Sequence, residues 1–201
     1  MSTHDLHNNS GERCILNLPS SYVHPPSDPR IAALVEAATE KLRNIQKNPT
    51  DFQANSDSSR MPKRFHGHGP EFDRELYEAA LDLCKDNEFV HALPLALVLT
   101  ANGSRNCRFP FLAGTCLQRL GMPAEAGAFF ETAAALDEKF DVTVAAQYRL
   151  GECLQALQIP DAATAAFEKT IDFARSDERH RHFQMLAEAR LATLSAGTSS
   201  I

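Results

Sequence analysis

Residues 114–131 read GTCLQRLGMPAEAGAFFE, and residues 151–168 read GECLQALQIPDAATAAFE. The second segment begins 37 positions after the first (151 − 114 = 37), and ten of the eighteen aligned positions are identical without a gap. The shared positions include the opening glycine, a Cys-Leu-Gln run, a proline and a phenylalanine. Chance is a poor explanation for such a match, so the chain contains an internal repeat.

A fainter copy of the repeat precedes these two. Five of its residues stand 34 positions before their counterparts in residues 114–133, namely Ala80, Leu83, Ala92, Ala96 and Leu99. A unit of 34 residues is the period of the tetratricopeptide repeat (TPR), which folds as two antiparallel helices. Gly114 and Gly151 allow the two helices to approach, and Pro123 and Pro160 begin second helices, where a missing N–H costs little.

The segments outside the repeats differ from them in character. Residues 1–27 are polar and carry few large apolar groups, so we expect a disordered tail. Asp28 and Pro29 are a helix-start signal, and the apolar residues that follow at helical spacing predict an amphipathic helix over residues 28–47. Residues 48–70, rich in Asn, Ser and Gly, predict a linker.

The repeat domain is expected over residues 71–195, followed by a disordered C-terminus at 196–201. One apolar stripe in its last part predicts a helix that closes the open end of the stack, and consists of Phe183, Ala187, Leu191 and Leu194. We therefore expect an all-α fold of three TPR helix pairs in a right-handed superhelix, with a C-terminal capping helix and an amphipathic N-terminal helix.

Composition and charge exclude several classes of function. The formal charge of −6, with no dense Lys/Arg stripe, argues against nucleic acid, and no apolar run is long enough to span a membrane. Five cysteines without a CxxC pair favour a reducing cytoplasm, and the shared repeat position of Cys116 and Cys153 favours packing over catalysis.

No catalytic motif or cofactor signature appears in the sequence, so we expect neither an enzyme nor a bound cofactor. The pair His66 and His68 offers only two imidazoles in a Gly/Pro linker, and we expect no metal site there.

Stacked helix pairs curve, so the first helix of each unit should face a concave groove. Outward positions at spacings of four and three residues fall on Tyr77, Leu81 and Cys84; on Phe111, Thr115 and Gln118; and on Tyr148, Glu152 and Gln155. An aromatic ring opens each set, which is typical of a groove for an extended peptide. The alternative is that these rings pack between the repeats.

Three stretches of the repeat domain resemble the class II chaperones of bacterial type III secretion, which serve pore-forming translocator proteins. They read LYEAA at residues 76–80, RFPF at 108–111 leading into AGTCL at 113–117, and YRLGECL at 148–154. The resemblance covers roughly residues 71–195. The segment before residue 71 is longer than is usual in that family, and residues 29–47 do not match its N-terminal helix.

The resemblance implies a cytoplasmic bacterial protein that keeps translocators soluble and unassembled before export. It implies client contacts at Tyr77, Leu81, Phe111 and Tyr148, and often a homodimer through the N-terminal helix. Residues 29–47 could dimerise, cap the repeats or occupy the groove. The alternative functions are a general TPR adaptor for another protein partner and a transcriptional co-regulator released by its client.

Overall fold

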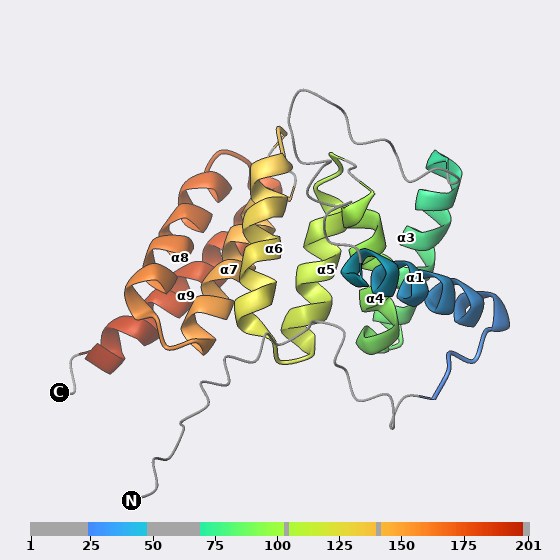
Figure 1. The fold of residues 1–201 in the computed structure, drawn as a ribbon. Coiled ribbons are helices and arrows are strands. Elements are labelled where there is room, and N and C mark those ends of the chain that lie inside the picture. The colour runs from blue at the N-terminus through green and yellow to red at the C-terminus, as the bar shows by residue number, and fades with distance from the viewer. Residues whose placement is uncertain (1–23, 48–68, 103–104, 140–141, 199–201) are drawn as a thin grey trace, which may run out of the picture.

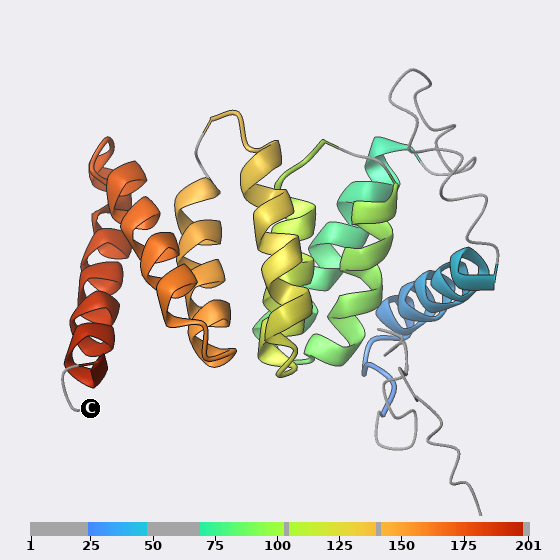
Figure 2. The same ribbon diagram turned by 60° about the vertical axis from the view of Figure 1, so that its left-hand side comes forward.

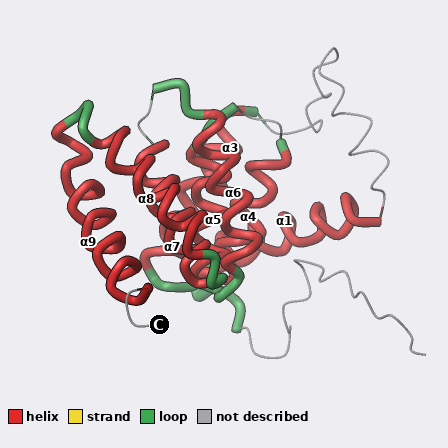
Figure 3. The backbone as a smooth tube through the Cα atoms, turned by 90° about the vertical axis from the view of Figure 1, so that its left-hand side faces the viewer, coloured by secondary structure: helices red, strands yellow, loops and turns green. Residues whose placement is uncertain are grey.

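The computed structural model describes residues 24–47, 69–102, 105–139 and 142–198. Within these ranges every regular element is a helix and no strand is present (Figure 3), so the expected all-α fold is confirmed. The helices are α1 (Pro29–Lys47), α3 (Pro70–Lys85), α4 (Phe89–Ala101), α5 (Arg108–Arg119), α6 (Pro123–Leu136), α7 (Thr143–Ala156), α8 (Pro160–Ala174), a short 3₁₀ turn (Glu178–His180) and α9 (Arg181–Thr198).

Local sequence signals set the starts of several helices. As predicted, α6 begins at Pro123 and α8 at Pro160. The carboxylate of Asp28 accepts a hydrogen bond at 2.8 Å from the backbone N–H of Arg30, which lies in the first turn of α1. Each signal satisfies or removes an N–H that a helix start would otherwise leave unpaired.

The two helices of each unit are joined by the same tight turn. One residue in each turn has a left-handed backbone, with φ of 62° at Asn87, 77° at Gly121 and 61° at Gln158. Directly after it, a backbone N–H donates to the carbonyl five residues upstream, over 2.8 Å from Glu88 to Leu83, 3.0 Å from Met122 to Leu117 and 3.0 Å from Ile159 to Leu154. This is the Schellman pattern that ends many helices. The three units therefore repeat in backbone conformation as well as in sequence.

From α3 to α9 the helices pack in chain order into one continuous array (Figures 1 and 2). At its C-terminal end α9 lies against α8 and also contacts α7. At the other end α1 packs against α4 (Figure 2). The described part of the chain therefore has a TPR-type stack with a helix at each end.

The close packing within a unit depends on small residues, as the sequence predicted. A Cβ atom built on Gly114 would stand 3.2 Å from the carbonyl oxygen of Ala126 and 2.9 Å from the ring of Phe130. Phe130 is fully buried. Glycine at position 114 thus leaves the space that this ring of α6 occupies against α5.

The amphipathic helix α1 docks onto the repeat domain. Its apolar residues pack against the main core, and Ala38 at the centre of its inner face is buried. Two polar contacts add to the docking: Arg30 pairs with Glu75 of α3 at 3.4 Å, and Lys41 donates to Asn102 at 3.0 Å. Among the roles that the sequence left open for this helix, the structure shows packing against the repeats, while dimerisation stays a prediction.

Several expectations concern the ends and the linker. Residues 1–23, 48–68 and 199–201 lie outside the described residues, which include neither His66 nor His68. Pro26, within the expected tail, is buried, and α9 continues to Thr198, beyond the expected domain end at residue 195. No helix in the described ranges has the length and apolarity needed to span a membrane.

Candidate functional site

The nine residues predicted to line the groove lie on α3, α5 and α7, the first helices of the three units. Side-chain contacts connect these helices directly. Tyr77 of α3 meets Phe109 of α5 with ring centroids 5.5 Å apart, and Gln118 of α5 donates to Glu152 of α7 at 3.3 Å. Neighbouring first helices are therefore in contact, and we name the surface on which the nine residues are predicted to lie the first-helix face.

Exposure divides the predicted residues into two groups. Eight of the nine are half-buried, which leaves part of each side chain open to a ligand. Tyr148 is the exception, since only 5% of it is exposed. Its ring packs against Phe167 at 5.7 Å and Phe183 of α9 at 5.8 Å, between the last unit and the capping helix. Most of the surface of Tyr148 is thus committed to packing.

The other two aromatic residues, Tyr77 and Phe111, are each packed in part against the protein and exposed in part. Phe111 lies 5.6 Å from Phe130 of its own unit. In the first unit the position equivalent to Phe130 is Ala96, which has no ring. Tyr77, the counterpart of Phe111, instead packs against Phe109 of the next unit. Burial is the main cause that raises the pKa of the Tyr77 hydroxyl, so this group stays a neutral hydrogen-bonding group near neutral pH.

Glu152 is the centre of a polar network on the first-helix face. One carboxylate oxygen accepts from Gln118 at 3.3 Å and from Arg149 at 3.0 Å, and the other accepts from Arg190 of α9 at 2.9 Å. Hydrogen bonding to Tyr148, and then to Glu152, raises the pKa of the Arg190 guanidinium. This network connects α5, α7 and α9.

Sequence reasoning missed both arginines of this network. Arg149 could have been found, because it stands three residues before Glu152 on one helix, a spacing that brings side chains together. Arg190 carried no such signal, since it lies 38 residues from Glu152 and outside the repeats. The carboxylate of Glu152, predicted to face the groove, is thus already paired within the protein.

Two thiols also meet on this face. The Sγ atoms of Cys84 on α3 and Cys116 on α5 are 3.7 Å apart, and neither cysteine is in a disulfide. Cys116 and Cys153 are buried, as their shared repeat position predicted.

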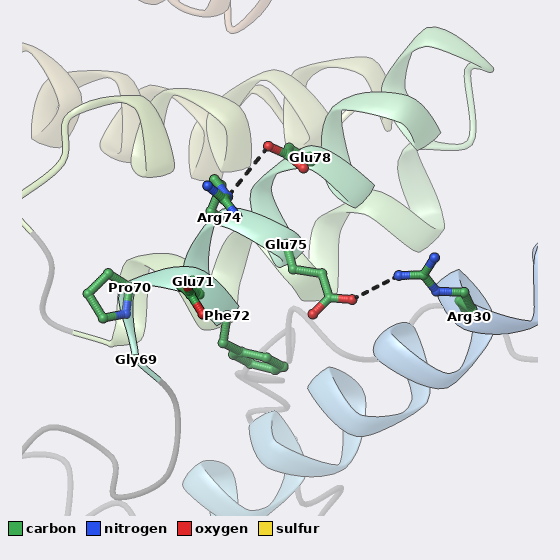
Figure 4. A pocket seen from close by; sticks show the side chains of 8 residues that line it. All are labelled: Arg30, Gly69, Pro70, Glu71, Phe72, Arg74, Glu75 and Glu78. Carbon is green, nitrogen blue, oxygen red and sulfur yellow. Dashed lines mark hydrogen bonds and ion pairs between the residues drawn. The ribbon is translucent and has the colours of Figure 1, made fainter.

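A separate hollow of about 730 Å³ lies at the N-terminal end of the array, between Arg30 of α1 and residues 69–78 (Figure 4). Its lining carries charges of both signs, and two ion pairs join them: Arg30 with Glu75 at 3.4 Å and Arg74 with Glu78 at 3.9 Å. None of the nine predicted residues lines this hollow. It is therefore distinct from the first-helix face.

Three arginines around the start of α9 are each paired with a carboxylate. Arg175 pairs with Asp172, Arg179 with Asp177, and Arg181 with Glu178. In the part of the chain that the structure describes, no group of three or more His, Cys, Asp or Glu side chains is arranged to hold a metal ion.

Comparison with solved structures places the fold among TPR proteins. PcrH, solved with the chaperone-binding region of PopD, superposes with a TM-score of 0.61 at 19% identity, covering 67% of this chain and 98% of PcrH. The Yersinia enterocolitica type III secretion chaperone SycD, solved with a peptide of the translocator YopD, gives 0.60 at 14% identity, covering 65% and 97%. The first TPR of Spaghetti, solved with an HSP90 peptide, gives 0.56 at 19% identity, covering 66% and 97%.

No family model and no curated protein matches the chain in sequence. At these identities the structural likeness establishes the fold. It shows that the chain shares its helical array with type III secretion translocator chaperones and with the first TPR of Spaghetti.

Proposed function

We propose that this protein is a chaperone for type III secretion translocator proteins in the bacterial cytoplasm. It binds an extended client segment along the first-helix face and keeps the client soluble and unassembled before export. The observation that supports this most is the extent of the shared fold: the match includes 98% of PcrH and 97% of SycD, both of which are solved with translocator segments.

The character of the first-helix face supports an extended ligand. Tyr77, Leu81 and Phe111 are half-buried apolar side chains that pack against the core from α3 and α5. Thr115 lies one turn after Phe111 on α5, and its hydroxyl donates to the Phe111 carbonyl at 2.8 Å, which leaves the hydroxyl oxygen able to accept a hydrogen bond. A surface with anchored apolar side chains and neighbouring polar groups suits an extended peptide. The apolar side chains of the peptide can pack against the former, and its backbone amides can form hydrogen bonds with the latter.

A general adaptor for another protein is the second candidate, because the TPR of Spaghetti shares the fold and is solved with an HSP90 peptide. A TPR that holds the carboxylates of such a peptide needs Lys or Arg and Asn free on its groove. Here Arg149 and Arg190 reach the first-helix face, but both pair with Glu152. This argues against the carboxylate-binding version of the adaptor.

Co-expression with candidate translocators tests the proposal. Wild-type protein should give a soluble complex, and Tyr77→Ala or Phe111→Ala should weaken it about tenfold or more, equivalent to about 1.4 kcal/mol of binding free energy. Phe173→Ala on α8 is the matched control, since it truncates a half-buried aromatic residue outside the first-helix face.

The thermal midpoint of each variant separates lost contacts from lost folding. Tyr148→Ala should mainly lower stability, since 5% exposure leaves it little contact with a ligand. A complex that forms equally well with Tyr77→Ala and Phe111→Ala would refute the binding face. A failure with every translocator, together with binding of an HSP90-type peptide, would favour the adaptor.

A further inference from the structure

Two reduced cysteines from neighbouring units are in contact. Cys84 lies on α3 and Cys116 on α5, 32 residues apart in the chain, and their sulfur atoms are 3.7 Å apart. Cys116 is completely buried, whereas Cys84 is half-buried and partly open on the first-helix face. The two sulfurs are already in contact, and a disulfide between them would shorten their separation to about 2.05 Å.

The repeat provides an internal comparison for this contact. The position of Cys84 is occupied by Gln118 one unit later, and the position of Cys116 by Cys153. The equivalent place between the second and third units thus holds an amide beside a thiol. Packing in a TPR stack does not require two cysteines here, because the chain fills the same place with a different pair.

We propose that Cys84 and Cys116 form a redox-modifiable dithiol site, which a low-molecular-weight disulfide of the glutathione class converts into a cross-link between α3 and α5.

The difference in exposure assigns a role to each sulfur. The Cys84 thiolate meets the reagent and attacks one sulfur of oxidised glutathione, which forms a mixed disulfide and releases one glutathione thiolate. Cys116, too buried to meet the reagent, then gives up its proton, attacks the Cys84 sulfur as a thiolate and releases the second glutathione. Both thiol protons end on the departing glutathiones, so the protein loses two electrons and the oxidant gains them.

The contact itself prepares these roles. A hydrogen bond from the Cys116 thiol lowers the pKa of Cys84, and the same hydrogen bond, followed by burial, raises the pKa of Cys116. Since the thiolate is the attacking species, Cys84 is the first thiol to react. Once Cys84 is in a mixed disulfide it carries no charge, so the hydrogen bond to the Cys84 thiolate no longer holds the proton on Cys116. The cross-link would join the first two units across the first-helix face.

Thiol mapping on the full-length protein tests the site. Reduced protein is treated with oxidised glutathione near neutral pH, quenched with acid, alkylated and mapped by peptide mass. To remove pairing by the cysteine outside the described residues, the experiment uses a Cys14→Ser background. We expect two thiols to disappear together, with Cys84 and Cys116 in one linked peptide pair.

Three variants distinguish the proposal from random oxidation. Cys116→Ala should stop at a glutathione adduct on Cys84, Cys84→Ser should leave Cys116 unmodified, and Cys153→Ser should cross-link like the parent protein. The site is refuted if the parent protein keeps both thiols under conditions that load glutathione onto Cys84 in Cys116→Ala. It is also refuted if the main linkage joins two chains.

Discussion

Gly151 lies directly against the ring of Phe167, so that a methyl group on Gly151 would stand 2.6 Å from one ring carbon. The second unit has the same relationship between Gly114 and Phe130, at 2.9 Å. In the first unit the ring position is Ala96, and the glycine position is Ala80. Glycine thus stands where a ring must fit against the first helix, and alanine stands where the partner position is also alanine.

Gly151→Ala should destabilise the fold by about 1–3 kcal/mol, because the added methyl group overpacks a fully buried ring. Gly127→Ala is the control, since its new methyl would meet Leu150 at 3.4 Å, an ordinary contact. Replacing a helical glycine without a clash should stabilise by about 0.5–1 kcal/mol. Urea unfolding of both variants measures the difference, and equal effects would contradict the close-packing account.

The repeated segment made much of the fold predictable, and the reason is physical. Small residues, prolines and rings recur at fixed spacing because each unit must bury the same faces, so helix pairs and the close approach at Gly114 could be expected. The docking of α1 could be expected only in part. An apolar stripe shows that a helix must be buried, but it does not show which surface covers it, here α4.

The candidate site was less predictable, because it depends on residues outside the repeat. The burial of Tyr148 comes from Phe183, and the pairing of Glu152 comes from Arg190, both on the capping helix. The contact of Tyr148 resembles that of Tyr77 with Phe109 of the next first helix, but the pairing of Glu152 has no counterpart, because the equivalent residues in the earlier units are Leu81 and Thr115. The binding role of the first-helix face stays a prediction.

Gln158 adopts a left-handed backbone with φ of 61° at a turn where the second unit has Gly121 with φ of 77°. Gln158→Gly should therefore stabilise the protein by roughly 1 kcal/mol, since a side chain in this conformation costs about 1–2 kcal/mol. Gly121→Ala should have the opposite effect through the backbone alone, because no atom lies within 4 Å of its new methyl. Thermal unfolding of both variants checks the sign, and a loss of stability in Gln158→Gly would contradict the prediction.

Asp137 connects the second and third units through hydrogen bonds that its buried carboxylate accepts. The donors are the backbone N–H groups of Lys139 at 3.3 Å, Val142 at 2.6 Å and Thr143 at 2.7 Å, and the Thr143 hydroxyl at 3.0 Å. Burial alone would raise the pKa of this carboxyl, but the hydrogen bonds outweigh it and lower the pKa below its ordinary value. Asp137→Ala leaves buried donors unpaired and should cost about 1–3 kcal/mol near neutral pH.

The same contacts predict how this cost depends on pH. A carboxyl with a lowered folded-state pKa stabilises the fold above its unfolded pKa, near 3.9, and loses that contribution as pH falls through the folded value. The gap in unfolding free energy between wild type and Asp137→Ala should thus be constant near neutrality and shrink in acid. Asp172→Ala, which removes a carboxylate with 73% of its side chain exposed, is the control and should show only a small gap. A gap for Asp137→Ala that does not shrink in acid would show that the charge is not what stabilises this turn.

Arg190 should hold the capping helix in place by joining α9 to Glu152 of α7 at 2.9 Å. Arg190→Gln should lower the free energy of unfolding by roughly 0.5–1.5 kcal/mol. This is less than the loss of a fully buried ion pair would cause, because the exposed fraction of the side chain is 43% for Arg190 and 17% for Glu152. Amide hydrogen exchange should then accelerate several-fold in residues 181–198, with little change in α5 and α6.

Arg181→Gln is the matched control on the same helix, since the side chains of Arg181 and its partner Glu178 are 68% and 80% exposed and their ion pair should contribute little stability. Equal exchange in both variants would show that apolar packing through Phe183 holds α9 by itself. Faster exchange only in Arg190→Gln would show that α9 stabilises the third unit partly through the polar network of the first-helix face.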